Sequence, residues 1–262
     1  MSYETIKYDI DGRIARVTFN RPGIHNAFNG TVITEMADVF DRIAGDDSLR
    51  VVLLTGQGKS FCAGADLNWM RGVIKQSFEE NLAESNLLAE LFWKIYTCRL
   101  PVIGRINGAA IGGGTGFVAV CDISIAARSA KFSFSEVKIG VVPACIGPYV
   151  VKKMGEGKAR ELFITGERMN GDRAYEVGLV NFVVDDEQLD DAVNALIKSV
   201  LSSGPKAVAM AKNLVSAVPG MQPEQFKPFT AEMIAKLRVS DEGQEGMDAF
   251  LNKRKPNWVI ND

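Results

Sequence analysis

Apolar and polar residues near the start of the chain follow first a strand period and then a helix period. Residues 14–20 (IARVTFN) alternate after the turn-forming DGR, which predicts the second strand of a hairpin. Residues 31–44 predict an amphipathic helix, because their apolar residues recur every three or four positions (Val32, Ile33, Met36, Val39, Phe40 and Ile43). The run RVVLLTG at 50–56 is apolar almost throughout and predicts a buried strand.

The middle of the chain continues to switch between the two patterns. Residues 81–98 predict a long amphipathic helix, with Leu87, Leu88, Leu91, Phe92 and Ile95 on its apolar face. Residues 101–107 (PVIGRIN) predict a strand, and FVAVCDISIAA at 117–127 predicts the end of a helix that leads into another strand. Strands and helices that alternate in this way favour an α/β fold with covered sheets.

The strand signals end near residue 186. The four segments beyond it all have helical patterns: 187–204, 205–218, 223–239 and 241–256. We therefore expect a core region at 1–186 and a helical C-terminal region at 187–262. The helices either extend the core or form an oligomerisation module, because appended helices commonly bury their apolar faces on a neighbouring chain.

Composition adds few constraints beyond those of an ordinary globular protein. The chain has 262 residues, 47% of them hydrophobic, and its 30 basic and 32 acidic residues give a formal charge of −2. This balance argues against recruitment of nucleic acid or an anionic membrane. The N-terminus lacks the apolar run of a signal peptide, and no stretch holds 18 uninterrupted apolar residues. We expect a cytoplasmic protein, or an organellar one that has lost a leader.

The cysteines do not predict a metal or redox site. Cys62, Cys98, Cys121 and Cys145 are separated by 23 to 36 residues, without C-x-x-C pairs, so we expect four reduced thiols and no metal site. A nucleophilic Cys62 is a minor alternative, for which His25, the one histidine in the chain, is the available partner. For His25 itself we favour a hydrogen bond that orients its loop.

Three consecutive glycines are the most informative local feature. In INGAAIGGGTGF (106–117) a strand pattern feeds bare backbone into a helix, whose first N–H groups lack intrahelical partners and attract negative charge. The segment could be a phosphate cradle, an oxyanion hole or a close helix–sheet contact; neither common phosphate-loop spacing fits it well. FCAGADLNWM (61–70) is a second small-residue turn before a helix. Two such turns could aim two amides at one oxygen atom.

Several motifs together resemble those of the crotonase family, the enoyl-CoA hydratase/isomerase superfamily. They are RPGIHNAF, FCAGADL, INGAAIGGG, CDISIAA and FSFSEVKIGVVP, in the family's order and spacing, with FLNKRKP near the C-terminus. The resemblance implies a spiral of ββα units followed by a helical trimerisation region, commonly in a dimer of trimers. It also implies acyl-CoA thioester substrates, with no cofactor other than the coenzyme A of the substrate.

The same resemblance implies roles for particular residues. The amides of Ala65 and Gly113 would form an oxyanion hole for a thioester enolate. Together with these two, the neighbours Ala63, Gly64, Asp66 and Leu67 would contact coenzyme A. Lys253 and Lys255 match basic residues that can approach its phosphates, although a solvated surface role is an equal alternative.

The chain departs from the family pattern at one catalytic position. Family hydratases typically use two glutamates. The second is Glu136 here, whereas Gly116 stands at the position of the first. Glu136 would be the general acid and base, its pKa raised by the apolar walls that we expect from Val137, Ile139, Val141 and Val142. Asn68, Glu79 and Glu80 lie in a segment that resembles the family's substrate-facing flap, and Ala144 lies in a loop that also departs from the pattern.

Three functions are compatible with these motifs. The first is a 2-enoyl-CoA hydratase, in which the pattern resembles bacterial enzymes for branched or carboxylated substrates such as methylglutaconyl-CoA. The second is a Δ3,Δ2-enoyl-CoA isomerase, which would need only the glutamate at position 136. The third is a non-catalytic acyl-CoA-binding homologue. We expect the hydratase.

Overall fold

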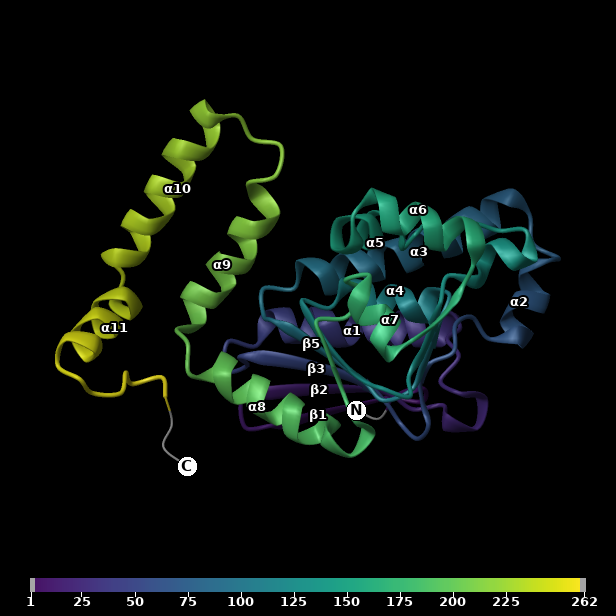
Figure 1. Ribbon diagram of the computed structural model, residues 1–262, viewed down its shortest axis with the longest axis horizontal. Coiled ribbons are helices and arrows are strands. Elements are labelled where there is room, and N and C mark those ends of the chain that lie inside the picture. Colours follow the sequence, from purple (N-terminus) through teal and green to yellow (C-terminus); the bar gives the residue numbers. More distant parts are fainter. Residues whose placement is uncertain (1–2, 260–262) are drawn as a thin grey trace.

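The computed structural model describes residues 3–259, which form two β-sheets, a shell of helices and a helical extension (Figure 1). The first sheet has the strand order β1-β2-β3-β5-β7-β10 and the second the order β4-β6-β8-β9. The first contains β1 (Ile6–Asp11), β2 (Ile14–Phe19), β3 (Val51–Gly56), β5 (Val102–Ile106), β7 (Ile123–Ala127) and β10 (Phe182–Val184). The second contains β4 (Ser60–Cys62), β6 (Ala109–Ile111), β8 (Lys131–Ser133) and β9 (Arg168–Asn170).

The chain visits the two sheets in turn. Strands β3, β5 and β7 of the first sheet are each followed within a few residues by β4, β6 and β8 of the second, and helices follow before the next pair. The pairings β3–β5, β5–β7, β4–β6 and β6–β8 are all parallel. Only the β1–β2 hairpin and the β8–β9 pair are antiparallel among the described strands. This spiral of ββα units is the predicted fold.

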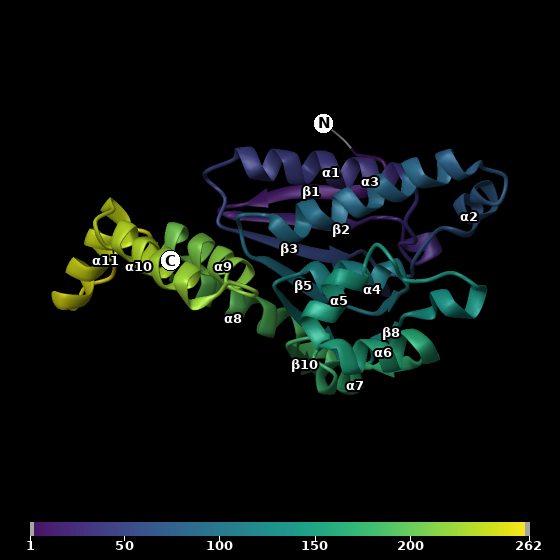
Figure 2. The same ribbon diagram turned by 90° about the horizontal axis from the view of Figure 1, so that it is seen from above.

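Helices cover both faces of the first sheet (Figure 2). α1 (Gly30–Gly45) and α3 (Phe78–Thr97) lie on one face, and α8 (Leu189–Leu201) lies on the other. Alternate residues of β3 separate accordingly: Val52 and Leu54 join the larger core cluster, whereas Val51 and Leu53 pack with residues of α8. A strand buried on both faces reads as a continuous apolar run, which is why RVVLLTG predicts its position well.

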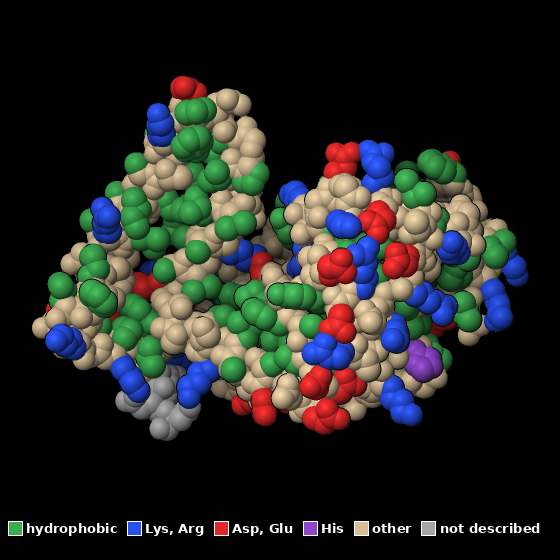
Figure 3. All heavy atoms as spheres, viewed as in Figure 1, with side chains coloured by type: hydrophobic (Ala, Val, Ile, Leu, Met, Phe, Trp, Pro, Cys, Tyr) green, Lys and Arg blue, Asp and Glu red, His purple; other side chains and the backbone are tan. Residues whose placement is uncertain are grey.

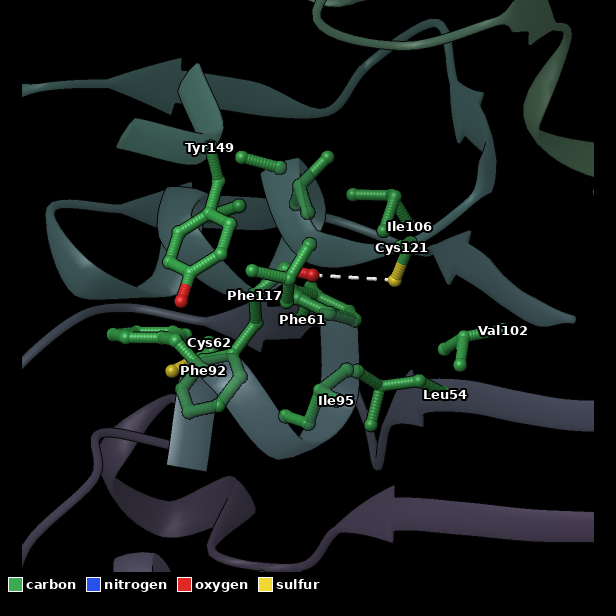
Figure 4. Packing of buried hydrophobic residues seen from close by; sticks show 14 of the residues in the cluster. Leu54, Phe61, Cys62, Phe92, Ile95, Val102, Ile106, Phe117, Cys121 and Tyr149 are labelled. Atoms are coloured by element: carbon green, nitrogen blue, oxygen red, sulfur yellow. Dashed lines mark hydrogen bonds between the residues drawn. The ribbon is translucent and has the colours of Figure 1, made fainter. Parts of the chain in front are cut away.

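Shorter helices surround the second sheet. They are α2 (Leu67–Val73), α4 (Gly113–Val120), α5 (Gly147–Met154), α6 (Glu156–Thr165) and α7 (Gly171–Glu176). Three 3-10 segments, Pro22–Ile24, Ser135–Ile139 and Asp186–Gln188, join larger elements. α4 is central, because seven of its eight residues are buried. Its Phe117 packs against Phe92 of α3, with ring centroids 4.9 Å apart, and Figure 4 shows these rings beside Tyr149 of α5.

The last helices leave the body of the molecule as an arm. This arm consists of α9 (Pro205–Ala217), α10 (Pro223–Arg238) and α11 (Asp241–Leu251). Near its base, Lys212 Nζ lies 2.7 Å from Asp122 Oδ2 and so joins α9 to the core. Hydrophobic side chains gather along the arm in Figure 3. Those that are well exposed are Val215, Ile234, Val239, Met247, Phe250 and Leu251.

Two details of the sequence-based description are wrong or incomplete. Leu87 is 59% exposed, although it was expected on the apolar face of α3; it lies at the edge of that face, whose buried residues are Leu91, Phe92 and Ile95. The three-residue strands of the second sheet were not anticipated, because so short a segment carries no readable period. The division at residue 186 stays a prediction.

Candidate active site

Two paired strands bring the two glycine-bearing turns together. β4 and β6 are parallel neighbours, so their carboxyl ends meet at one edge of the second sheet. The first bend, residues 63–66, follows β4, and the second bend, residues 112–114, follows β6. The sequence predicted two turns that could act together, and the strand pairing is the physical reason that they lie side by side.

The bends pack against each other through bare backbone. A Cβ on Gly64 would lie 2.8 Å from the carbonyl oxygen of Ile111, and a Cβ on Gly114 would lie 2.0 Å from that of Cys62. Gly64 also has a φ of +95°, a conformation that residues with side chains rarely adopt. These glycines are therefore required for the close approach of the two bends.

Phe28 fixes the first bend. Its backbone N–H donates to the Gly64 carbonyl at 2.8 Å, and its own carbonyl accepts from the Asp66 N–H at 2.8 Å. In this parallel bridge the Ala65 N–H points away from Phe28. Among the described residues, the Ala65 N–H has no acceptor. The first bend thus has one backbone donor, the Ala65 N–H, that is available to a ligand.

Asp66 anchors the end of the same bend. Its carboxylate caps α2 by accepting from the Asn68 N–H at 2.7 Å, and it forms a salt bridge of 2.8 Å with Arg21. Burial by itself would raise the pKa of this carboxyl, but the Asn68 and Arg21 hydrogen bonds outweigh burial and lower it. The Asp66 side chain is thus engaged within the protein, and any contact with coenzyme A would fall to the backbone of this residue.

The second bend begins α4 without a side-chain cap. Gly112 has a φ of +55°, and its N–H donates a hydrogen bond to the Ser133 carbonyl at 2.8 Å. The next N–H, that of Gly113, has no acceptor in the part of the chain that the structure describes. It lies in the first turn of a helix, where the dipole favours negative charge. Gly113 also abuts the Phe28 ring, because a Cβ there would lie 2.8 Å from Phe28 Cε1. Phe28 thus contacts both bends, although the sequence did not single it out.

Glu136 places a carboxyl beside the second bend. A Cβ on Gly112 would lie 3.3 Å from Glu136 Oε1. The other oxygen, Oε2, is buried and has no hydrogen-bond partner in residues 3–259. Burial raises the pKa of Glu136, as predicted. The expected apolar walls are wrong in part: Ile139, Val141 and Val142 are each more than half exposed and only Val137 is half-buried, because the 3-10 segment and the loop after it lie at the surface.

Apolar side chains fill the space beside Gly116. A Cβ at this position would lie 2.1 Å from Ile146 Cγ2 and 3.0 Å from Phe92 Cζ, and both side chains are buried. The glutamate that the family pattern would place at position 116 therefore has no room. The role of Ile146 was not visible in the sequence, because residues 116 and 146 meet only in the folded chain.

His25 and Cys62 have structural roles. The His25 Nδ1 lies 3.0 Å from Ser60 Oγ, which agrees with the expected hydrogen bond of its loop, and the His25 carbonyl also accepts from the Ala63 N–H of the first bend at 3.0 Å. Cys62 is fully buried, and burial raises its pKa to about 12, which disfavours a nucleophilic thiolate. All four cysteines are free thiols, as the sequence predicted.

The remaining sequence candidates lie at the periphery. Leu67 is 71% exposed at the start of α2. In the flap segment, Asn68 Oδ1 accepts from Arg71, Glu79 is exposed, and Glu80 completes a capping box with Ser77. Ala144 is exposed too.

Lys253 and Lys255 follow α11, at the opposite end of the molecule from α2 in both ribbon views, so they do not lie near the bends of their own chain. The expected approach of these residues to coenzyme A is therefore not formed within a single chain. The surface role that the sequence left open agrees with this position.

A second cleft lies far from the bends. A cleft of about 620 Å³ lies between the arm and the core, but Arg50 and Leu100 on its wall precede β3 and β5, at the edge of the first sheet opposite the bends. Among residues 3–259, no group of three or more His, Cys, Asp or Glu could hold a metal ion. None of the described helices combines the length and hydropathy that a membrane span requires.

Comparisons with known proteins place the chain in a family. The family model described as enoyl-CoA hydratase/isomerase matches residues 9–261. A crotonyl-CoA hydratase of Syntrophomonas wolfei is 34% identical over 99% of both chains.

Solved structures agree over the whole length. An enoyl-CoA hydratase from Shewanella pealeana is 39% identical, with a TM-score of 0.94 over 98% of this chain and 96% of that one. Pseudomonas aeruginosa AtuE is 31% identical, with a TM-score of 0.95 over 98% of this chain and all of that one.

Proposed function

The chain belongs to the enoyl-CoA hydratase/isomerase family, and from that premise we propose that it adds water across the 2,3 double bond of a 2-enoyl-CoA thioester. In this proposal Ala65 and Gly113 supply the oxyanion hole and Glu136 is the single acid and base. The observation that carries the proposal is the pair of interlocked bends with two unused N–H groups next to a buried carboxyl.

The thioester oxygen is the acceptor that the two bends lack. Nucleophilic attack on a conjugated thioester moves negative charge onto its carbonyl oxygen, and two fixed backbone donors stabilise that charge more than they stabilise the ground state. Removing one donor of such a pair typically costs about 2.7–4 kcal/mol of activation free energy. Because the donors belong to bends locked by glycine contacts, they need no reorganisation during the reaction.

Glu136 moves the proton. The water oxygen bonds to C3 while the π electrons shift toward the thioester oxygen, and a proton of that water passes to the Glu136 carboxylate. The enolate electrons then return to C2, which takes the proton from the Glu136 carboxyl, so the carboxylate is regenerated. A carboxyl whose pKa is raised by burial is suited to both halves of this exchange near neutral pH.

The acyl group and the assembly are further parts of the proposal. The pattern of motifs favours branched or carboxylated 2-enoyl-CoA substrates, such as methylglutaconyl-CoA. Exposed apolar side chains along the arm support packing against further copies of the chain, as a homotrimer or a dimer of trimers. Coenzyme A enters as part of the substrate, along residues 63–67.

One observation favours a second candidate, the Δ3,Δ2-enoyl-CoA isomerase. Ile146 and Phe92 exclude a carboxyl from the space beside Gly116, and an isomerase needs only one group to carry a proton between C4 and C2. In that reaction Glu136 would take a proton from C4 and return it to C2, with no water added. Both candidates use the same oxyanion hole and the same glutamate, so only an assay separates them.

The test follows the absorbance of the conjugated thioester. Loss of absorbance with a 2-enoyl-CoA indicates hydration, and its gain from a 3-enoyl-CoA indicates isomerisation. Glu136→Gln should lower kcat by at least about 100-fold while it leaves KM nearly unchanged, because proton transfer and uniform binding are separable. Glu167→Gln, an exposed glutamate, is the matched control. Tight binding of acyl-CoA without either reaction would instead support the non-catalytic homologue.

A further inference from the structure

The wall formed by α4 cannot hold the water that the proposed hydration requires. At Gly116, the Ile146 and Phe92 side chains occupy the volume that a second carboxyl would need, and neither has a polar atom to offer. Glu136 can accept one proton of a water molecule, but a water held by one partner is poorly oriented for attack. A second acceptor must therefore come from another element.

Glu84 of α3 is a carboxyl without an assigned role. The residue is only partly exposed, and its Oε2 atom is buried without a hydrogen-bond partner among the described residues. Leaving a buried acceptor unsatisfied is costly, and more so if it is charged, so such groups usually have a ligand or a water. Glu136 Oε2 is a buried carboxylate oxygen in the same condition. The Oε2 atoms of Glu84 and Glu136 need no partner within the chain if both bind a water or substrate that enters the site.

Glu84 lies on the face of α3 that reaches the space beside Gly116. Glu84, Leu88 and Phe92 are four residues apart in turn, so they share one face of α3. Leu88 packs on the core cluster, and Phe92 reaches the space beside Gly116.

The loop before α5 also contacts this part of α3. The Cys145 thiol lies 3.8 Å from the Ser85 carbonyl, next to Glu84 in sequence, and Cys145 directly precedes Ile146. The loop that supplies Ile146 and the turn of α3 that carries Glu84 are therefore in contact.

We propose that Glu84 is a water-positioning residue and supplies, from α3, the second carboxyl that α4 lacks. This inference rests on the proposed hydratase function. Glu84 accepts a hydrogen bond from one proton of the water, while Glu136 takes the other proton as the water oxygen bonds to C3. Glu84 ends the step in the protonation state in which it began, so the balance of the reaction is unchanged. The 2-enoyl chain itself offers no donor to this oxygen, and water does.

The decisive variant is Glu84→Met, which keeps the length of the side chain but removes its ability to accept hydrogen bonds. We expect kcat for hydration of a 2-enoyl-CoA to fall about 10- to 100-fold, because a misplaced water loses this much in rate, with KM changed less than about twofold. Glu84→Gln retains an acceptor oxygen and should recover part of the loss. Glu90→Gln, an exposed glutamate of the same helix, is the matched control and should behave as the unaltered enzyme.

A second readout separates this role from a structural one. Exchange of the C2 protons of butyryl-CoA in D2O requires the oxyanion hole and Glu136 but no attacking water. It should persist in Glu84→Met and disappear in Glu136→Gln. Unaltered hydration in Glu84→Met overturns the inference, as does a parallel loss of hydration, exchange and Tm, which would mark a structural role. Retained hydration in Glu136→Gln would overturn the proposed function instead.

Discussion

At the scale of single residues, the structure keeps two kinds of group unsatisfied. Within residues 3–259, the N–H groups of Ala65 and Gly113 lack acceptors and one oxygen of Glu136 lacks a donor, and all three groups lie near one edge of the second sheet. Such groups lower the stability of the folded chain and are retained where they bind something. The raised pKa of Glu136 reflects the cost of burying its ionised carboxyl.

Glu136→Gln should stabilise the folded protein in a manner that depends on pH. Burial raises the pKa of Glu136 above the ordinary value of a glutamate, so the ionised carboxyl is less stable in the folded chain than in the unfolded chain. Its destabilising effect is absent at low pH and develops as pH rises from the unfolded pKa through the folded one. The variant should therefore gain Tm at pH 7, by about 2–4 °C for each kcal/mol regained, and little near pH 4.

Thermal unfolding at both pH values measures this gain, with Glu167→Gln as the control for removal of an exposed charge. An equal change in Tm at the two pH values would contradict the assignment of the effect to ionisation of Glu136.

The contact between the bends has its own test at Gly114. In Gly114→Ala the new Cβ would lie 2.0 Å from the Cys62 carbonyl oxygen, which is backbone and cannot turn aside. The bends must then separate, and we expect kcat/KM to fall by at least about 100-fold, the effect of losing one oxyanion donor. Gly157→Ala in α6 meets nothing within 4 Å and is the control. Steady-state kinetics decide the matter, and near-normal activity of Gly114→Ala would show that the contact is dispensable.

At the scale of elements, α4 links the chemistry to the core. Its first turn presents the free Gly113 N–H, and its later residues pack against Phe92 of α3 and Ile146 at the start of α5. Gly116 lies where these helices touch. Its lack of a side chain is therefore a packing requirement of three helices as well as the loss of a carboxyl.

Residues 116 and 146 should be energetically coupled. Gly116→Ala forces a Cβ to within 2.1 Å of Ile146 Cγ2, and overpacking of this kind costs about 1–3 kcal/mol. Ile146→Ala leaves a cavity that costs about 2–5 kcal/mol. The double variant should lose less than the sum, because each change relieves the other. Denaturant unfolding of the four proteins gives the coupling, and additive losses would contradict direct contact.

The sequence predicted the larger elements because their periods are long enough to read. The buried run at β3, the hairpin of β1 and β2, and the helices α1, α3 and α8 to α11 all match segments read from hydrophobic spacing. The three-residue strands of the second sheet carry no such period, yet their pairing is what brings the bends together.

The candidate site was predictable only in part, for a related reason. Glu136 and the glycines stand in local motifs, whereas Phe28 and Ile146 contact the glycines from segments far apart in the chain. Exposure of Ile139, Val141 and Val142 is also set by tertiary structure, so their apolar character misled the prediction.

At the scale of the whole molecule, the helical arm leaves several large apolar side chains uncovered by its own chain. Its exposed apolar residues include Phe250 at 82% and Val239 at 78%. Soluble monomers rarely expose large apolar patches, and further copies of the chain would cover these side chains. Figure 3 shows hydrophobic side chains gathered along the arm.

Val215→Asp should weaken assembly. Val215 lies on α9 and is 74% exposed, so a charge there costs little in the monomer but much in a buried interface. Sedimentation analysis should show dissociation, together with a Tm that depends on protein concentration. Ile164→Asp, on α6 and 70% exposed, is the matched control and should leave the assembly intact. The same mass for both variants and the unaltered protein would argue against burial of α9.

The two donors proposed for the oxyanion hole belong to the main chain, which restricts the positions at which the site can change in evolution. A side chain at position 65 can be exchanged without removing its amide, whereas Gly64 and Gly114 admit no replacement without forcing the backbone apart. Substitution should therefore be most restricted at Gly64 and Gly114, which supply neither of the proposed donors, and freer at position 65, which supplies one of them. A lineage built on such a cradle is free to relocate its acids and bases and so to acquire new reactions, while the cradle itself stays as it was.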